Sequence, residues 1–366
     1  MKKYFEIYKQ LKEEIVSGEY RAGEKLPSKR TLADKCGVSV ITVEMAYSML
    51  ADEGYVSPRE RSGYFVCHVD TELARGATDG AQVLHRPEPL PEETEEGGAE
   101  FEYSVYLKSL RKVISDKGAR LFVRSPGKGC AVLRNAISEY LFRYRGMYAP
   151  PARIIIGSGS EQLYETAVKL LGRDKIYAIE DPSYAQISAV YEGMGVRICR
   201  LPMGSDGIVS EAAEEEFDIL HVTPFHSYPS GVTATVSKRY EYLSWIKKRG
   251  GYVIEDDFDS EFFLPGQPIE SLYSLDRSNS VIYINTFSKS LSPSMRLGYM
   301  ILPETLIDKY DERLGHFSCT VPVLEQHALA EFISCGGFER HLNRQRRKMR
   351  TANIEKNVKN RGNIYK

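Results

Sequence analysis

The first seventy residues carry two kinds of hydrophobic pattern. Apolar side chains recur every three to four positions in three stretches, which predicts three short amphipathic helices. Alternating residues at 55–57 and 64–66 then predict two short strands joined by a turn. Three helices followed by a hairpin are typical of a winged helix-turn-helix, which we expect over residues 1–69. The residues predicted to face its core are Ile7, Leu11, Ile15, Leu32, Ala33, Val43, Ala46, Tyr47 and Leu50.

Caps and glycines mark the ends of these helices. Gly18 ends the first helix, and Gly37 breaks the second. Ser28 and Ser39 stand where a side-chain oxygen can cap the second and the third helix. Gly54 stops the third helix before the first strand.

Beyond residue 104, short apolar runs alternate with helical patterns. Such runs favour a mostly parallel, buried sheet of the α/β class. We therefore expect an α/β domain with a seven-stranded sheet over residues 105–366. The expected strands are 154–156, 176–179, 196–200, 219–222, 252–254, 281–284 and 299–302.

The stretch between these two parts has a different composition. Residues 70–104 are rich in Pro, Glu and Gly, and acidic residues outnumber basic ones nine to two between positions 70 and 100. Because such a composition cannot bury enough apolar surface to fold, it predicts an extended acidic linker. An acidic interaction segment is the alternative.

The overall composition restricts the class of protein. The 366 residues are 42% hydrophobic and 27% charged, which is ordinary for globular domains. The six cysteines form no C-x-x-C pair, which favours reduced thiols over a disulfide framework or a metal site. We find no stretch suited to a signal peptide or a membrane span, so we expect a cytoplasmic protein.

Candidate ligand-binding residues follow five of the expected strands. Ligands of parallel sheets bind at the carboxyl ends of strands, so these residues are candidates for one site. Gly159 and Ser160 open a helix after the first strand and can cradle a phosphate. Tyr184 follows the second strand, residues 223–231 follow the fourth, an acidic triplet with Asp256 follows the fifth, and Lys289 follows the sixth.

The stretch from Thr286 to Arg296 combines a candidate nucleophile with groups that bind anions. Lys289, just past a buried strand, can lose solvation and act as an amine nucleophile toward a carbonyl. Thr286, Ser288 and Arg296 supply hydroxyls and a guanidinium for an anion. An aldehyde that carries a phosphate, such as pyridoxal 5'-phosphate (PLP), suits this set. An ordinary surface loop is the alternative.

The stretch SGEYRAGEKLPSKRTLADKCGVSVITVEMAYSMLADEGYVSPRERSGYFV closely resembles the GntR-type winged helix of bacterial regulators. The resemblance implies binding to double-stranded operator DNA, with a protein-interaction module as the alternative. The expected contacts are Lys29, Arg30, Arg59 and Arg61 to phosphates, and Ser39 and Thr42 to phosphates or base edges. The chain departs from the family at Val40 and Ile41, where a polar pair is common. Two apolar residues cannot make bidentate base contacts, although they can pack on thymine methyl groups.

In the large domain, the motifs SGS, EDPSY, PSG, EDD and TFSKSLSPSMRLGY stand in the order of a fold-type I aminotransferase. With the winged helix they resemble the MocR subfamily of GntR-type regulators over residues 4–350. The resemblance implies a PLP-binding sensor domain, a homodimer and an amino-acid or amine effector. Carried over by motif, Lys289 forms the Schiff base, Asp256 (runner-up Asp257) pairs with the ring nitrogen, Tyr184 stacks on the ring, and Gly159, Ser160, Thr286, Ser288 and Arg296 bind the phosphate.

Two departures from that family weigh against an active transaminase. Phe258 stands where the family has a tyrosine that donates a hydrogen bond to the cofactor, and Tyr228 is a candidate substitute. The family's C-terminal subdomain, with its arginine for the substrate carboxylate, is expected to be largely missing beyond residues 340–350. We therefore expect a regulator. The alternatives are a PLP-dependent aminotransferase acting on an amino acid, and a degenerate protein with neither activity.

Overall fold

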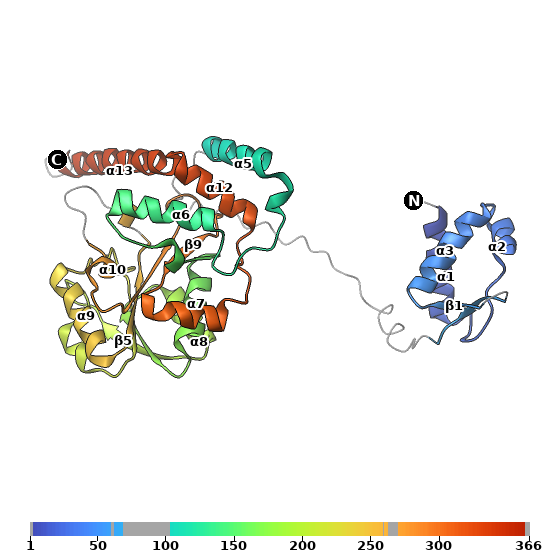
Figure 1. Cartoon of the computed structure of the whole chain (residues 1–366), viewed down its shortest axis with the longest axis horizontal. Coiled ribbons are helices and arrows are strands. Elements are labelled where there is room, and N and C mark those ends of the chain that lie inside the picture. Colours follow the sequence, from blue (N-terminus) through green and yellow to red (C-terminus); the bar gives the residue numbers. More distant parts are fainter. Residues whose placement is uncertain (1–2, 60–61, 69–102, 259, 263–269, 363–366) are drawn as a thin grey trace. The chain divides into compact units, whose positions relative to one another are not determined.

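The computed structural model describes residues 3–59, 62–68, 103–258, 260–262 and 270–362, with side chains as far as residue 351 in the last range. The chain divides into two compact units, Met1–Thr94 and Glu95–Lys366, and each is described by itself (Figure 1). Within the described ranges, no helix combines the length and the hydropathy needed to cross a membrane.

The N-terminal unit is a winged helix-turn-helix, which confirms the prediction from the hydrophobic pattern. Three helices precede a hairpin of two antiparallel strands. The elements are α1 (Lys3–Ser17), α2 (Lys29–Cys36), α3 (Val40–Asp52), β1 (Val56–Arg59) and β2 (Gly63–Val66).

Both predicted serine caps are formed in this unit. The Oγ of Ser28 accepts a hydrogen bond from the backbone N of Thr31 at 3.1 Å. The Oγ of Ser39 accepts one from the backbone N of Thr42 at 3.2 Å. Gly37 ends α2 with a φ of 63°, a left-handed conformation that glycine adopts without a Cβ clash.

The core of the N-terminal unit contains the residues that the helical periodicity predicts. Val43, Ala46, Tyr47 and Leu50 of α3 are fully buried. The Tyr47 hydroxyl donates a 2.8 Å hydrogen bond to a backbone carbonyl before α2, and the Tyr47 ring meets that of Tyr64 in β2 with centroids 4.9 Å apart. Tyr47 therefore fixes the hairpin against α3.

The large unit is built on a seven-stranded sheet with the order β3-β9-β8-β7-β6-β4-β5. Strand β9 runs antiparallel to both of its neighbours, and all other neighbouring pairs are parallel. This confirms the predicted mostly parallel α/β sheet. The strands are β3 (Ile154–Gly157), β4 (Ile176–Asp181), β5 (Arg197–Pro202), β6 (Ile219–Val222), β7 (Tyr252–Asp256), β8 (Val281–Thr286) and β9 (Gly298–Ile301).

Alternate residues along the strands face two layers of helices. Ile282 and Ile284 of β8 pack with α7, α8 and α11, whereas Val281 and Tyr283 face the opposite layer. That layer contains α6, α12 and the start of α13, with α9 and α10 further along the sheet (Figure 1). These helices are α6 (Ala131–Tyr140), α7 (Ser160–Leu171), α8 (Ala185–Gly193), α9 (Val236–Arg249), α10 (Leu272–Leu275), α11 (Ile307–Leu314), α12 (Val323–Ser334) and α13 (Gly337–Gly362).

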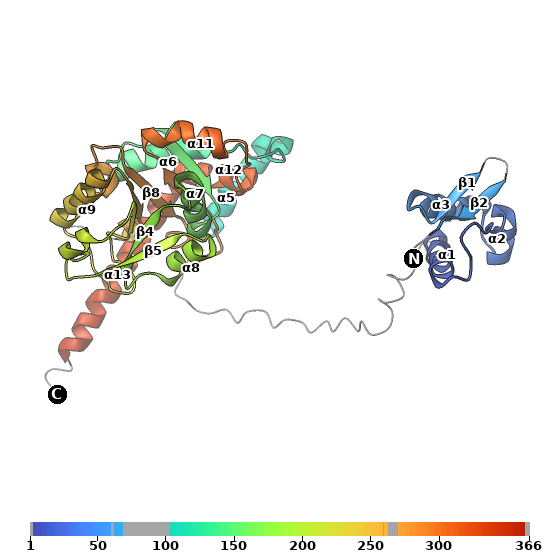
Figure 2. The same cartoon turned by 90° about the horizontal axis from the view of Figure 1, so that it is seen from below.

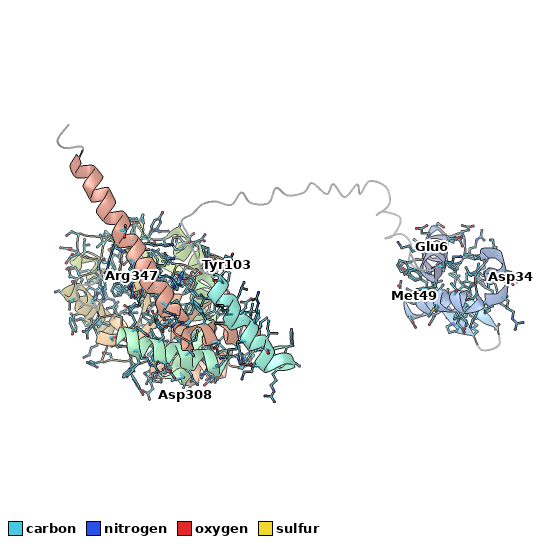
Figure 3. All side chains as sticks on the ribbon, turned by 90° about the horizontal axis from the view of Figure 1, so that it is seen from above. Glu6, Asp34, Met49, Tyr103, Asp308 and Arg347 are labelled. Carbon is cyan, nitrogen blue, oxygen red and sulfur yellow. The ribbon has the colours of Figure 1, made fainter. Side chains whose placement is uncertain are left out.

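The segment predicted as a linker lies mostly outside the described residues. Helix α5 (Tyr103–Lys117) begins one residue before the predicted end of that segment at residue 104. Its apolar side packs on α12, where Tyr106 meets Phe332 edge-on with ring centroids 5.7 Å apart. Packing of this first turn explains why the helix starts earlier than the composition indicates. The C-terminal part of α13 extends away from the body of the large unit (Figures 2 and 3).

Candidate functional site

The carboxyl ends of β3, β4, β6, β7 and β8 lie at one edge of the sheet, because these strands run in the same direction. The register sets Asp256 of β7 beside Ile284 of β8, and Glu255 beside Val222 of β6. The segments after these strands therefore come to one region, as ligand sites of parallel sheets do. We call the segments 157–162, 180–184, 223–231, 255–258 and 286–296 the strand edge.

Lys289 lies in the turn after β8, and its side chain is exposed. Its Nζ is 4.7 Å from the centroid of the Phe258 ring, which follows β7. An ammonium group over an aromatic face is a favourable contact. The predicted nucleophile therefore stands against Phe258, which offers a ring face without a hydroxyl.

Gly159 and Arg296 touch at the N-terminus of α7. Gly159 has a φ of 100°, and a Cβ atom at this position would come within 2.7 Å of the Arg296 Nη2. The same Nη2 donates a 2.6 Å hydrogen bond to Oε2 of Glu161 in the first turn of α7. The structure thus brings Gly159, Ser160 and Arg296 together where backbone N–H groups and the helix dipole favour an anion.

The other predicted residues of this site come from β8 and from the segment after β4. Thr286 ends β8 and is buried, and the Oγ of half-buried Ser288 donates a 3.5 Å hydrogen bond to the carbonyl of Met295. Tyr184 is 44% exposed and meets Tyr228 edge-on, with ring centroids 6.1 Å apart. Tyr228, the candidate source of the missing hydroxyl, therefore borders the predicted stacking ring.

Asp257 is held entirely within the fold. Its Oδ2 accepts hydrogen bonds from Arg145 Nη2 at 3.0 Å, from the Tyr283 hydroxyl at 2.7 Å and from the Ser260 hydroxyl at 2.6 Å. Its Oδ1 accepts a further one from the Ser260 backbone N at 3.1 Å. A fully buried carboxylate with an ion pair and this many donors serves the packing of the domain.

Asp256, at the end of β7, has a different environment. Its Oδ2 accepts a hydrogen bond from the Tyr164 hydroxyl and lies 3.9 Å from Nε2 of His221. Burial, together with the charge of Asp256, raises the pKa of Tyr164 well above its ordinary value, so the phenol stays protonated and donates. Since Asp257 is saturated by interior partners, the geometry favours Asp256 as the carboxylate available to a ligand.

Sequence reasoning missed three buried residues behind Asp256. Tyr191 and Nδ1 of His221 share a 2.7 Å hydrogen bond, and the rings of Tyr164 and His221 have centroids 5.0 Å apart. Nε2 of His221 is buried and has no hydrogen-bond partner among the described residues. One signal was present in the sequence: His221 interrupts a buried apolar run, where a polar ring needs a partner.

Glu180 is a second buried carboxyl at the strand edge. Its Oε1 accepts a 3.1 Å hydrogen bond from the backbone N of Thr223, and the Ser227 hydroxyl donates to its Oε2. Burial raises the pKa of Glu180 from 4.5 to about 8, because the charged form loses its hydration. The protonated form is therefore the stable one below that pH.

Glu180→Gln should reduce the pH dependence of stability. Because the folded pKa lies above the unfolded one, the wild-type free energy of unfolding falls as pH rises from 4.5 to about 8. Glutamine cannot ionise, so on going from pH 5 to pH 8.5 the variant should gain at least about 1.4 kcal/mol relative to the wild type. Urea unfolding followed by Trp245, the chain's one tryptophan, measures this. Exposed Glu211→Gln is the control, and equal pH profiles for Glu180→Gln and the wild type would contradict the prediction.

The predicted phosphate contacts of the N-terminal unit surround α3. Arg30 of α2 and Arg59 of β1 are exposed. Lys29 forms an ion pair with Glu44 of α3, and its Nζ is 5.7 Å from the centroid of the Tyr64 ring in β2. Because surface ion pairs contribute little, Lys29 can exchange this carboxylate for a phosphate.

Ser39 and Thr42 take part in capping α3. Their hydroxyl oxygens are 2.8 Å apart, in addition to the backbone hydrogen bond already described. A hydroxyl that accepts one hydrogen bond can still donate another, so their contacts to phosphates or base edges stay a prediction. Arg61, the remaining predicted contact, lies outside the described residues.

Comparison with known families matches both units of the chain. Residues 3–66 match the gntR family of bacterial regulatory proteins. Residues 103–358 match the class I and II aminotransferases. The two matches fall on the winged helix and on the α/β unit that contains the strand edge.

Two relatives align with more than nine tenths of this chain. The HTH-type transcriptional regulator YdeL of Bacillus subtilis is 34% identical over 94% of this chain and 76% of its own length. The probable rhizopine catabolism regulatory protein MocR of Rhizobium meliloti is 29% identical over 93% of this chain and 74% of its own length.

A solved structure matches the large unit. LysN, the α-aminoadipate aminotransferase of Thermus thermophilus, is 27% identical with a TM-score of 0.60, over 68% of this chain and 65% of LysN. That structure is a complex with N-(5'-phosphopyridoxyl)-L-leucine. The chain belongs to the MocR-like HTH-type transcriptional regulators, in which a GntR winged helix precedes an aminotransferase class I and II domain.

Proposed function

We propose that this protein regulates transcription by binding operator DNA through its winged helix, with a PLP-binding unit as its sensor. The observation that carries the proposal is the combination, in one chain, of an exposed face of α3 and a strand edge with Lys289, Asp256 and Arg296. A helix-turn-helix places its second helix, here α3, in the major groove, and the hairpin adds contacts to the sugar-phosphate backbone of the DNA.

The residues of the strand edge fit PLP. Gly159 leaves room that a Cβ would fill, so a phosphate can approach the N-terminus of α7 closely. Arg296 would exchange the Glu161 carboxylate for that phosphate. When held at Lys289, PLP would supply an electrophilic carbon, the former aldehyde carbon, that primary amines attack, and a ring that takes up electrons. The residues proposed to hold it are Lys289, Asp256, Tyr184, Gly159, Ser160, Thr286, Ser288 and Arg296.

The chain's own residues set the properties of this site. Asp256 would supply the negative charge that pairs with the ring nitrogen, and the hydrogen bond from Tyr164 fixes the carboxylate orientation. Tyr184, at the rim, would cover the ring and restrict access of water. An amino-acid or amine effector suits the site because it carries the same functional group as Lys289.

A homodimer is part of the proposal. The expected operator contact of one winged helix is small, and twofold symmetry lets two of them read two half-sites. An effector bound to the large unit can then change the affinity for DNA by altering the distance between the two winged helices of the dimer.

A second candidate function is transamination, which the aminotransferase fold favours. Phe258 weighs against efficient turnover, because its ring faces Lys289 without a hydroxyl that could donate to the cofactor. Sustained exchange of an amino group between an amino acid and a keto acid, catalysed by the PLP-loaded protein, would assign the chain to the enzymes instead.

DNA binding is tested with Arg30→Ala and Arg59→Ala in the full chain. Each variant should weaken binding to a duplex from upstream of the gene, because a phosphate contact is lost. The slope of log K against log salt should fall by about 0.9 for each lost contact. Fluorescence anisotropy at several salt concentrations gives both values.

The matched control is Arg173→Ala, which removes an exposed arginine from the large unit. It should leave both affinity and salt slope unchanged. Wild-type protein that shows no salt-sensitive binding, or Arg30 and Arg59 variants that behave like Arg173→Ala, would contradict the proposed function.

A further inference from the structure

Helix α3 exposes apolar side chains on the face opposite its core. Val40 is 41% exposed, Ile41 68% and Met45 53%. Ile41 and Met45 are four residues apart, so they lie one above the other on the same side of the helix. Large apolar groups gathered on the outer face of a short surface helix indicate a contact with a partner.

The same helix lacks the side chains that usually read bases through paired hydrogen bonds. All 13 residues of α3 are described, and none of them is Arg, Lys, Asn or Gln. Polar groups in its first two turns already have partners. Thr42 is joined to the cap residue Ser39, and Glu44 is paired with Lys29 of α2. Bidentate readout of guanine or adenine is therefore not available to α3.

The surroundings of this face are cationic and carry hydrogen-bond donors. Arg30 lies at the start of α2, and Arg59 lies in the hairpin with its guanidinium 4.3 Å from the centroid of the Phe65 ring. Lys29 connects α2 to α3 and to the hairpin through Glu44 and Tyr64. An apolar strip bordered by cations complements the DNA major groove, where phosphates flank the base edges.

We propose that Val40, Ile41 and Met45 recognise the 5-methyl groups of thymine in the major groove. The proposal rests on DNA binding by the winged helix and adds the chemistry of its base readout. Thymine presents a methyl group in the major groove, whereas guanine, adenine and cytosine present hydrogen-bonding groups there. The N-terminal residues of a recognition helix are the ones that reach the bases. Arg30 of α2 and Arg59 of the hairpin, on the elements next to α3, would contact the flanking phosphates.

The test uses pairs of duplexes that differ only in the methyl group. The full chain is titrated with a 24-base-pair alternating dA-dT duplex and with the same duplex containing deoxyuridine in place of thymidine. A second pair compares alternating dG-dC with its 5-methyl-deoxycytidine form. We expect each methyl group in contact to tighten binding about fourfold, from the free energy of burying one such group. Both pairs should show this preference, so a change in DNA shape cannot explain it.

The double variant Ile41→Ala, Met45→Ala should bring both ratios close to one while leaving the salt slope unchanged. Its side chains are exposed, so the fold does not depend on them. Val236→Ala, at an exposed apolar residue of α9, is the matched control and should keep the wild-type ratios. Arg30→Ala should weaken binding to all four duplexes equally.

Two results would overturn the proposal. One is equal wild-type affinity for the members of each pair, and the other is a methyl preference that survives in the double variant. If the double variant with unchanged ratios also sediments in a different oligomeric state, the strip is a protein contact. Absence of salt-sensitive binding to every duplex would also contradict DNA binding itself, so the two failures are distinguishable.

Discussion

Lys289→Ala should abolish covalent retention of PLP. Wild-type protein incubated with PLP and reduced with borohydride should carry one cofactor per chain, attached within the peptide that contains Lys289. The variant should carry none at that position, because alanine has no amine to attack the aldehyde. Mass spectrometry of the intact protein and of its peptides gives the stoichiometry and the site, and the visible absorption of the unreduced protein should disappear in parallel.

A matched lysine is needed here because any exposed amine reacts slowly with an aldehyde. Lys247→Ala removes an exposed lysine from α9 and should label like the wild type. Unfolding followed by Trp245 shows whether either change affects the fold. Undiminished labelling of Lys289→Ala at one other lysine would move the attachment point away from the strand edge, where Lys289 is the one lysine. Labelling spread over surface lysines in the wild type would contradict PLP binding at this site.

The winged helix could be predicted almost residue by residue, for a local reason. Its helices are short and each is bounded by its own signals, so that Ser28 caps α2, Gly37 ends it and Ser39 caps α3. Their apolar periodicity indicates the buried side directly. The exposure of Ile41 follows from the same periodicity, since it falls opposite the buried positions.

The sequence predicted the individual strands of the sheet, but it predicted neither their order nor the direction of β9. The 287–297 segment joins β8 to β9 in a span shorter than a usual crossover helix, and this length favours the antiparallel return that the structure shows. Strand order is different, because it depends on packing between segments far apart in the chain. The pairing of β4 with β6 and of β3 with β9 leaves no local signal.

The candidate site was predictable where its chemistry follows a strand directly. Lys289, Asp256 and Gly159 stand in short motifs whose position after a strand is visible in the sequence. Tyr164 and His221 are not, because the first lies inside a helix and the second inside a strand. From the sequence alone, each is predicted to be a core residue, and only the fold shows that both lie next to Asp256. Sequence patterns thus predict groups that can face a ligand more readily than the groups that support them.

Asparagine substitutions at the two adjacent aspartates should have opposite effects. Asp257→Asn leaves the Arg145 guanidinium, 13% exposed, without its charged partner. Removing one member of a buried ion pair costs about 3–5 kcal/mol, so the free energy of unfolding should fall by that amount. Asp256→Asn keeps an oxygen that accepts from Tyr164, so its stability should change by less than about 1.5 kcal/mol.

The effects on PLP affinity should be the reverse of the effects on stability, with the larger loss in Asp256→Asn. Asp256→Asn replaces the charge proposed to face the ring nitrogen with a neutral amide, so PLP should bind at least about tenfold more weakly, a loss of about 1.4 kcal/mol. Asp257→Asn should keep its affinity at temperatures where it remains folded, since its oxygens point to Arg145, Tyr283 and Ser260. Urea unfolding followed by Trp245 and absorbance titration with PLP measure the two quantities separately. If Asp257→Asn loses affinity while Asp256→Asn loses stability, the two roles must be exchanged, and the hydrogen bonds that hold Asp257 in the interior must then rearrange when the cofactor binds.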